Sequence, residues 1–176
     1  MRRKATGYIP VAPWIPFSAR AALEPRLTPD FFVWEIGSGY STIWLSQRVR
    51  KLVSLEASEP WYQRIREELT ARSLSNVDLR HEWRAERMAD FSELADGALD
   101  LLFIDGGPRS DCLKKGFQKV RGGGWVYLDN WDTQEFWPGC HEFLERHADE
   151  VSVVSSYVDY VPAQFGVYEG LLIQKR

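Results

Sequence analysis

From Phe31 onward, short apolar runs alternate with segments of helical periodicity, and this alternation allows very few folds. The runs 31–36, 52–55 and 99–105 are largely apolar on both faces, which is typical of strands that are buried on both sides. Between them, segments such as 58–73 carry apolar residues three to four positions apart, as amphipathic helices do. A strand is also expected at 125–128, after a turn at the glycine triplet 122–124, and a helix around 140–148, because Pro138 disfavours a helix that runs through from Thr133. Apolar strands separated by helices predict an α/β fold with a parallel sheet covered on both faces.

The end of the chain departs from this alternation. Two apolar segments, 151–158 and 167–175, follow one another with no helix between them, and Pro162 and Gly166 lie in their connection. Adjacent strands with a short connection predict a hairpin at one edge of the sheet.

The length of 176 residues is that of one ordinary domain. Residues 1–28 hold four of the nine prolines and only one short helical segment, Ser18–Leu23, for which Ser18 is the expected N-cap. We therefore expect a single domain over residues 1–176, in which residues 1–28 form an arm that packs over a core of residues 29–176.

Charge and composition exclude several classes of partner. The formal net charge is −3 and the basic residues are scattered, whereas avid binding to nucleic acid needs a basic patch, so no nucleic-acid partner is expected. No apolar run approaches the ~20 residues of a membrane span, so no membrane partner is expected either. The two cysteines, Cys112 and Cys140, make no disulfide framework, and no signal peptide is seen, which predicts a cytoplasmic protein.

The first strand ends in the sequence EIGSG, in which Glu35 precedes Gly37 and Gly39. Two glycines one residue apart allow a tight turn and let the backbone approach a ligand closely. The next helix begins near Ser41 and Thr42, so its N-terminal amides are expected to face that ligand. Ligands of open α/β sheets bind beyond the carboxyl ends of the strands, which makes this turn the predicted ligand site.

The residue types in the turn discriminate between ligands. A dinucleotide site would need another glycine three residues after Gly39, and Thr42 stands there instead, where its side chain would crowd a pyrophosphate. Glu35 would repel phosphates, whereas a carboxylate suits a cationic or amine-bearing ligand. The simpler alternative is a glycine turn with no ligand, in which Glu35 is a solvated strand end.

Acidic residues follow the second and third strands as well. Glu56 lies about twenty residues after the turn, where an acidic side chain is expected to bind ribose hydroxyls. Glu82 and Trp83 follow the third strand and are candidates to hold and stack an adenine, although simple packing explains Trp83 equally well.

These stretches, together with LDLLFIDGGPRSDCL and VRGGGWVYLDNWD, resemble the class I S-adenosylmethionine-dependent methyltransferases. The resemblance covers roughly residues 31–131 and the terminal hairpin, and it is strongest to small bacterial methyltransferases of the E-x-G-x-G-x-S-T type. It implies a Rossmann-like, seven-stranded mixed sheet of order 3-2-1-4-5-7-6, with the last strand antiparallel and helices on both faces. It also implies S-adenosylmethionine as the cofactor, with Glu35 near the amino end of its methionine.

The resemblance assigns the contacts to that cofactor. The glycine turn would hold the methionine end, the acidic residue after the second strand would bind the ribose, and the residues after the third strand would contact the adenine. The full set of predicted cofactor-binding residues is Glu35, Gly37, Ser38, Gly39, Ser41, Thr42, Glu56, Ala57, Glu82, Trp83 and Asp105.

The fourth strand ends in FIDGG and the fifth in YLDNW, which places Asp105, Asp129 and Asn130 beside the expected cofactor pocket as the predicted catalytic residues. Two carboxylates and an amide are hard oxygen ligands that suit Mg²⁺ or Ca²⁺. In the catechol-type O-methyltransferases, an Asp after strand four and an Asp-Asn pair after strand five hold a divalent cation, and the resemblance carries that role to these three residues. The alternatives without a metal are turn chemistry for Asp105 and loop capping for Asp129 and Asn130.

The predicted substrate contacts are Arg109 and Trp131. Arg109 is a candidate to clamp a substrate carboxylate or phosphate, or else a surface arginine at a helix start that Ser110 or Asp111 caps. Aromatic residues are expected to wall the acceptor pocket, which favours an apolar or sugar-like acceptor: Tyr8, Trp14, Trp131 and Trp137.

The sequence thus predicts methyl transfer from S-adenosylmethionine to a small-molecule or sugar-type acceptor, preferentially at oxygen. A small acceptor is expected because the chain lacks the large inserted domains that recognise nucleic acid or protein substrates. The alternatives are a cofactor-binding domain without catalysis and, with less support, a nicotinamide-dependent oxidoreductase. A homodimer is compatible with the sequence.

Overall fold

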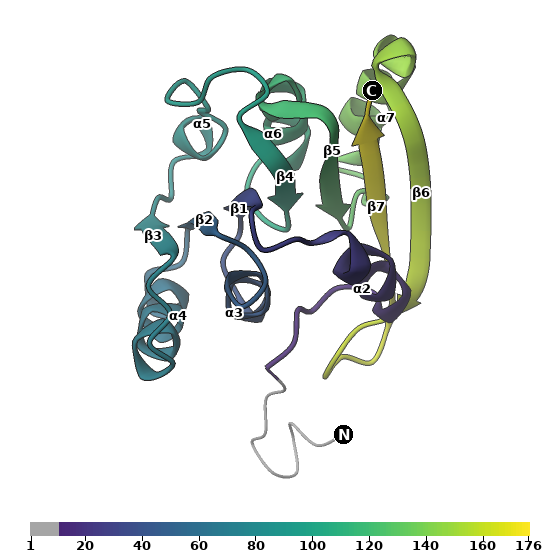
Figure 1. Cartoon of the computed structure of the whole chain (residues 1–176). Helices are drawn as coiled ribbons and strands as arrows, with labels where there is room; N and C mark the ends of the chain where they lie inside the picture. The colour runs from purple at the N-terminus through teal and green to yellow at the C-terminus, as the bar shows by residue number, and fades with distance from the viewer. Residues whose placement is uncertain (1–10) are drawn as a thin grey trace.

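Seven strands form one mixed sheet in the computed structural model, which describes residues 11–176 (Figure 1). The order is β3-β2-β1-β4-β5-β7-β6, and β7 runs antiparallel to both of its neighbours while the first five strands pair in parallel. The predicted strand order and the antiparallel last strand are therefore confirmed. The strands are β1 Phe32–Ile36, β2 Lys51–Glu56, β3 Val77–His81, β4 Leu99–Ile104, β5 Val120–Asp129, β6 Val151–Tyr160 and β7 Val167–Lys175.

Helices cover both faces of this sheet, as predicted. One face carries α2 (Phe17–Leu23), α3 (Tyr40–Ser46) and α4 (Glu59–Ala71), and the other carries α5 (Ala85–Met88), α6 (Arg109–Gly116) and α7 (Trp137–Arg146). Short 3₁₀ turns complete the chain: η1 Glu24–Arg26, η2 Phe117–Lys119 and η3 Ala148–Glu150.

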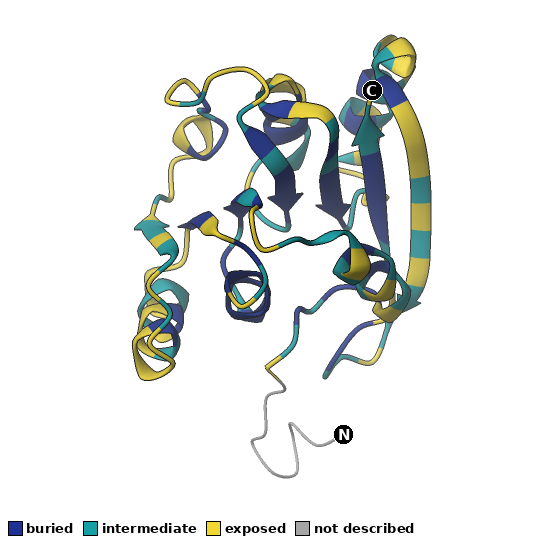
Figure 2. Ribbon diagram, viewed as in Figure 1, coloured by how far each residue is buried: buried dark blue, intermediate teal, exposed yellow. Residues whose placement is uncertain are grey.

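Alternation along β1 divides the core into two layers. Val33 packs in the cluster that includes α2 and α3, whereas Trp34 and Ile36 pack in the cluster under α5, α6 and α7. Glu35 follows the same alternation, so its carboxylate points toward α3. Figure 2 shows that the most buried strands are the central ones, while β6 and β3 expose residues at the two edges.

The described part of the N-terminal arm is built into the core. Ile15, Ala19 and Leu23 are almost inaccessible to solvent and pack in one cluster with Leu101 and Phe103 of β4. Residues 1–10, and with them the predicted pocket residue Tyr8, lie outside the residues that the structure describes.

Several predicted helix boundaries were wrong. Ser18 is not the N-cap of α2, because the helix starts at Phe17 and the Ser18 amide instead donates to Asp159 of β6 over 3.0 Å. Neither Ser110 nor Asp111 caps α6, which begins one residue earlier at Arg109. The helix expected to begin at Cys140 starts at Trp137, because a proline at its second position is compatible with a first helical turn.

The strand expected at 125–128 is longer because it begins before the glycine triplet 122–124. Gly123 adopts a positive φ of 75°, and the pairing of β4 with β5 shifts register between Leu99 and Leu101. Both irregularities belong to the start of β5, so the glycines form a bulged strand and not the predicted turn before it. Among residues 11–176, no helix combines the length and the apolar character required to cross a membrane.

Candidate active site

The glycine turn lies where the strand order reverses, between β1 and β4. Gly37 adopts a φ of +90°, and a Cβ atom there would lie 2.8 Å from the carbonyl carbon of Asp105. The contact is equally tight from the other side, because a Cβ on Gly106 would lie 2.8 Å from the Cα of Gly37. Two backbone loops thus touch at the carboxyl ends of neighbouring strands, which only glycine permits at these positions.

The buried carboxylate of Glu35 holds the turn in place through hydrogen bonds. Its side chain is fully buried, and its two oxygens accept hydrogen bonds from the hydroxyls of Ser41 (2.6 Å), Thr42 (2.6 Å) and Ser54 (2.5 Å). Burial raises the pKa of Glu35 to about 7, although the three hydroxyl donors counteract that rise. The alternative that Glu35 is a solvated strand end was wrong.

Thr42 explains why the third glycine of a dinucleotide turn is missing. Its hydroxyl accepts the Gly39 amide hydrogen over 2.9 Å while donating to Glu35, so it ties the turn to the buried carboxylate. Ser38 is fixed in the same way, because its hydroxyl pairs with that of Ser54 over 2.7 Å. The predicted contact of Glu35 with a cofactor amino group stays a prediction.

The ends of β4 and β5 bring Asp105 and Asp129 together. Their side chains hydrogen bond to each other, and Asp129 also accepts the Tyr127 hydroxyl over 2.7 Å. Burial, and then the neighbouring Asp129 carboxylate, hold the pKa of Asp105 well above its usual range. Burial also raises the pKa of Asp129, although the hydrogen bonds from Tyr127 and Asp105 oppose that rise.

Arg109 lies against this pair. Its Nε donates to the Asp129 carbonyl over 2.8 Å, its NH2 group lies 3.6 Å from Asp105 Oδ1, and its guanidinium covers the Phe136 ring at 4.9 Å. The guanidinium is therefore engaged inside the protein, and the predicted clamp on a substrate anion stays a prediction. The alternative of a free surface arginine does not fit these contacts.

A cavity of about 260 Å³ joins the glycine turn to the carboxylate pair. Segments beyond those strand ends complete its wall: the arm, the starts of α3 and α4, the β6–β7 connection and the start of β7. The lining residues are Trp14, Ser38, Gly39, Tyr40, Ser41, Trp61, Asp105, Asp129, Asn130, Val161, Gln164 and Tyr168.

The aromatic wall differs from the predicted one. Trp14 lines the cavity as expected, but the described lining residues do not include Trp131 or Trp137. Trp131 packs against the core under α6 and α7, and Trp137 is 43% exposed and stacks on a histidine of its own helix. Neither tryptophan is among the described lining residues of this cavity, and the predicted contact of Trp131 with the substrate stays a prediction.

Trp61 replaces them, and the sequence pattern did not single it out. Its indole N–H donates to the Ser38 carbonyl over 2.6 Å, which fixes the turn, and its ring lies 5.8 Å from Trp14 and 6.1 Å from Tyr40 between centroids. Val161, Gln164 and Tyr168 were also missed. Only the signal that Pro and Gly mark a loop between the last strands could have drawn attention to them.

The predicted ribose residue, Glu56, lies at the end of β2 with 8% exposure, and its Oε1 accepts the Ser58 amide over 2.7 Å. Burial raises the pKa of Glu56. Ala57 beside it is exposed, and its carbonyl lies 3.2 Å from His81 Nε2. Neither residue lines the cavity described above, so their contact with a ribose stays a prediction.

Of the two predicted adenine residues, Glu82 lines a second hollow of about 360 Å³ together with Leu55, and Trp83 is not among its described lining residues. The Arg84 side chain pairs with Glu82 over 2.7 Å and lowers the pKa of Glu82 to about 2. Trp83 is 69% exposed, so the alternative that it packs in the core was wrong, and its stacking on adenine stays a prediction.

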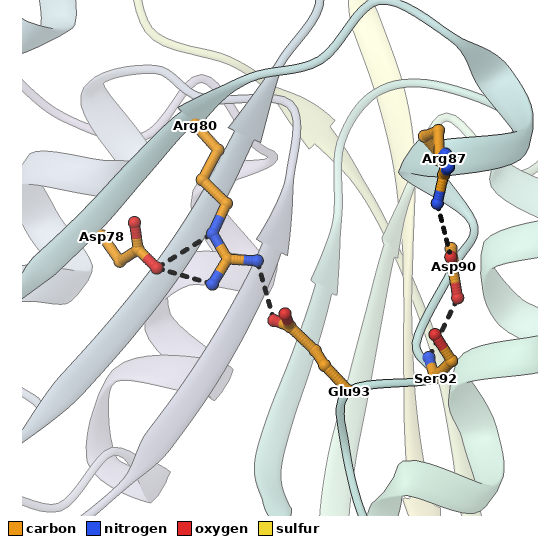
Figure 3. Close-up of polar contacts among 6 residues, drawn as sticks. All are labelled: Asp78, Arg80, Arg87, Asp90, Ser92 and Glu93. Atoms are coloured by element: carbon orange, nitrogen blue, oxygen red, sulfur yellow. Dashed lines mark hydrogen bonds and ion pairs between the residues drawn. The ribbon is translucent and has the colours of Figure 1, made fainter.

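Charged pairs hold the outer rim of this hollow. Arg80 extends from β3 between Asp78 and Glu93, with ion-pair distances of 2.6 and 2.7 Å (Figure 3). Asp90 forms a second pair with Arg87 at 3.5 Å and accepts the Ser92 amide over 3.0 Å. The rim is thus crosslinked between β3 and the segment after α5.

Comparison with known families decides what this arrangement is. Residues 34–131, which contain the glycine turn, the carboxylate pair and four of the seven strands complete, match a family described as "Methyltransferase domain". The chain belongs to this family. Its sheet order and helix layers make it a class I S-adenosylmethionine-dependent methyltransferase, as the sequence predicted.

Solved structures share the fold of this methyltransferase at low sequence identity. A Klebsiella pneumoniae protein assigned to the O-methyltransferases aligns with a TM-score of 0.70 and 21% identity, covering 89% of this chain and 77% of its own. TomG from Streptomyces achromogenes is an O-methyltransferase of tomaymycin synthesis that was solved with S-adenosylmethionine. It aligns with a TM-score of 0.68 and 20% identity, covering 89% of this chain and 77% of its own. An rRNA methylase from Streptococcus thermophilus aligns with a TM-score of 0.66 and 12% identity, covering 90% of this chain and 94% of its own. No curated protein matches the sequence. The acceptor differs among these neighbours, so the fold does not determine it.

Proposed function

We propose that this methyltransferase transfers the methyl group of S-adenosylmethionine to a hydroxyl of a small-molecule or sugar-type acceptor. The observation that supports it is the shared cavity, in which the glycine turn forms one wall and Asp105, Asp129 and Asn130 form another. A donor held at the turn and an acceptor held at the carboxylates would meet within this space. Such alignment supplies most of the rate enhancement in a displacement reaction.

The carboxylate pair suits removal of a hydroxyl proton. We assign the role of base to Asp129, because its carboxylate lies on the cavity wall and is held by the Tyr127 hydroxyl. The acceptor oxygen forms its bond to the methyl carbon as the carbon–sulfur bond breaks, its proton passes to Asp129, and S-adenosylhomocysteine leaves. Tyr127 and Arg109 are positioning residues here, because each hydrogen bonds to Asp129 and neither is among the described lining residues of the cavity.

S-adenosylmethionine supplies the electrophilic methyl group when it is bound. The residues proposed to hold it are those of the turn, with Ser38, Gly39 and Ser41 already on the cavity wall, and Glu56 and Glu82 toward the adenosine. The close approach of Gly37 to the Asp105 backbone leaves that wall without protruding side chains, which fits a ligand lying across it.

We also propose Asp105, Asp129 and Asn130 as ligands of a divalent cation such as Mg²⁺. Their oxygens are hard donors on one wall of the cavity, and each carboxylate keeps one oxygen that neither Arg109 nor Tyr127 engages. A cation there would polarise the acceptor hydroxyl. No group of three or more His, Cys, Asp or Glu side chains suited to a metal occurs within residues 11–176, so these two carboxylates need the Asn130 amide.

Two alternatives to this function make different demands on the site. A domain that binds the cofactor without catalysis would keep the glycine turn, and a nucleic-acid acceptor would need a basic surface around the cavity. Its lining holds no Lys, Arg or His among the described residues, which supports a small acceptor and no nucleic-acid partner. We further infer a cytoplasmic location, which the two buried, unbridged cysteines Cys112 and Cys140 support.

Radiolabelled S-adenosylmethionine tests this proposal. The protein is incubated with the donor and either the small-molecule fraction of a cell extract or purified total RNA. We expect alkali-stable label in the small-molecule fraction, and we expect Asp129→Ala to abolish it while leaving the affinity for S-adenosylhomocysteine within about threefold. Label found only in RNA would contradict the proposed acceptor, and no turnover despite tight donor binding would support the non-catalytic alternative.

EDTA separates the two roles of the carboxylates. If the cation is used, EDTA removes activity and Mg²⁺ restores it, whereas full activity in EDTA eliminates the cation and leaves Asp129 as a proton acceptor alone. Asn130→Ala serves as the matched variant, because it removes a cation ligand and spares both carboxylates.

A further inference from the structure

Strand β6 forms an open edge of the sheet. Among residues 11–176 it pairs with β7 alone, so the other side of its ten-residue backbone has no strand partner. Figures 1 and 2 show it running along the outside of the molecule, largely exposed, with α2 against one of its faces. Open N–H and C=O groups along a strand of this length form a template for another strand.

Apolar side chains gather on the face of β6 that α2 does not cover. Tyr157 and Asp159 point toward α2, so the alternating residues Val154, Val158 and Tyr160 point to the opposite face. These three are 50%, 62% and 60% exposed, and α7 does not extend over them because it packs above Leu171 and Ile173. Val167, which is paired with Tyr160, adds another half-exposed apolar side chain at 54%.

The edge has few of the devices that keep strands apart. Residues 151–160 contain no Lys, Arg or Pro, and the pairing with β7 is irregular only between Val151 and Val153. Asp159 is the strand's one charged residue, and it turns inward to accept the amides of Ser18 (3.0 Å) and Tyr160 (2.7 Å). No charged side chain of β6 itself points onto the uncovered face, where Glu169 of β7 accepts a hydrogen bond from the Ser156 hydroxyl.

We propose that the partner of this edge is a second copy of the chain, paired antiparallel through β6 about a twofold axis. The sequence of β6 is self-complementary in one register, because an axis at Ser156 sets Val154 opposite Val158 of the partner subunit. Both valines lie on the uncovered face, so the twofold axis joins the two apolar strips into one. In this register the one charged residue of the strand, Asp159, stands opposite Val153 of the partner subunit, so no like charges of the two strands face each other.

The pairing leaves each active site self-contained. Every residue lining the main cavity lies outside β6, and the nearest, Val161, follows the strand's last residue. The dimer is thus separable from the proposed methyl transfer, and either can fail without the other.

Sedimentation velocity over a concentration series of the full chain tests the proposal. We expect a species of twice the 20.4 kDa chain mass for the wild type. The double variant Val154→Lys, Val158→Lys should raise the dimer dissociation constant at least about 100-fold, because it buries unpaired charge in the strip. Both side chains are exposed in the monomer, so circular dichroism should show unchanged folding.

The matched control is Trp83→Lys, which places a positive charge on an exposed apolar residue, 69% accessible, that follows β3 at the opposite edge of the sheet. It should leave the dimer intact. Amide hydrogen exchange gives a second readout, since residues 152–160 should be protected more strongly as the concentration rises. A monomeric wild type, or a dimer that persists in the double variant, would overturn the proposal.

Discussion

At the scale of single residues, Glu35 and the hydroxyls around it form the base of the glycine turn. The folded-state pKa of about 7 lies above the ordinary value of 4.5, so the folded protein keeps a proton that the unfolded chain loses as the pH rises between those values. The contribution of Glu35 to stability is therefore fully present below pH 4.5 and is lost as the pH rises through about 7. The difference corresponds to about 3 kcal/mol.

Glu35→Gln should remove this dependence, because an amide does not titrate. We expect the free energy of unfolding of the wild type, relative to the variant, to fall by about 2–3 kcal/mol from about pH 5 to about pH 8. Urea denaturation at several pH values measures it. Glu67→Gln, which changes an exposed glutamate of α4, should keep the wild-type profile. Parallel profiles for the wild type and Glu35→Gln would contradict the assigned burial.

Gly37 and Gly97 both adopt positive φ, but only Gly37 lies against another backbone. Gly97→Ala should cost about 1–2 kcal/mol of stability for the left-handed conformation alone, since its Cβ would meet nothing closer than 3.8 Å. Gly37→Ala should cost at least about 3 kcal/mol and weaken S-adenosylhomocysteine binding, because it also separates the two loops. Thermal melts and calorimetric titration measure both, and equal losses would show that the close approach is unimportant.

The sequence was informative about residues whose roles depend on the local chain. The spacing of Gly37 and Gly39 was enough to predict the turn, since positive φ is a local requirement. The sequence was not informative about Arg109 or Trp61, whose hydrogen-bond partners are the backbone carbonyls of Asp129 and Ser38. Those carbonyls are 20 and 23 residues away in the chain, and no periodicity records such pairings.

At the scale of elements, β5 and β7 fit together through Tyr127 and Gly170. A Cβ on Gly170 would lie 2.9 Å from two ring carbons of Tyr127 and closer still to its hydroxyl oxygen, so the glycine makes room for the group that holds Asp129. Gly170→Ala should destabilise the protein by about 1–3 kcal/mol through overpacking.

A double-mutant cycle tests this fit between the strands. In a Tyr127→Phe background the closest contact is gone, so Gly170→Ala should cost at least about 1 kcal/mol less than in the wild type. Chemical denaturation of the four proteins gives the coupling free energy. Additive losses would mean that Gly170 does not serve the Tyr127 hydroxyl.

Elements were predictable where the pattern is long and regular. The apolar runs of β1, β2 and β4 and the stripe of α4 gave the layers correctly, and the resemblance supplied the strand order. The four-residue α5 was missed because one turn is too short to show periodicity. The start of β5 was missed because glycines mark turns in most sequences, whereas here they form a bulge.

At the scale of the whole molecule, the cavity is assembled from segments that only the fold brings together. The arm supplies Trp14, the strand ends supply the carboxylates, and the terminal hairpin supplies Gln164 and Tyr168. The sequence predicted the strand-end residues because parallel strands end at one edge. It did not predict the hairpin residues, since their place depends on how β6 and β7 return across β5.

The central claim is that S-adenosylmethionine lies across the glycine turn with its sulfur toward Asp105 and Asp129. A crystal structure of the protein with S-adenosylhomocysteine and Mg²⁺ tests it most directly. We predict the ribose at Glu56, the methionine end at Ser38 and Gly39, and the sulfur facing the carboxylate wall. A ligand bound elsewhere, or a site that takes NAD and not S-adenosylhomocysteine, would contradict this account.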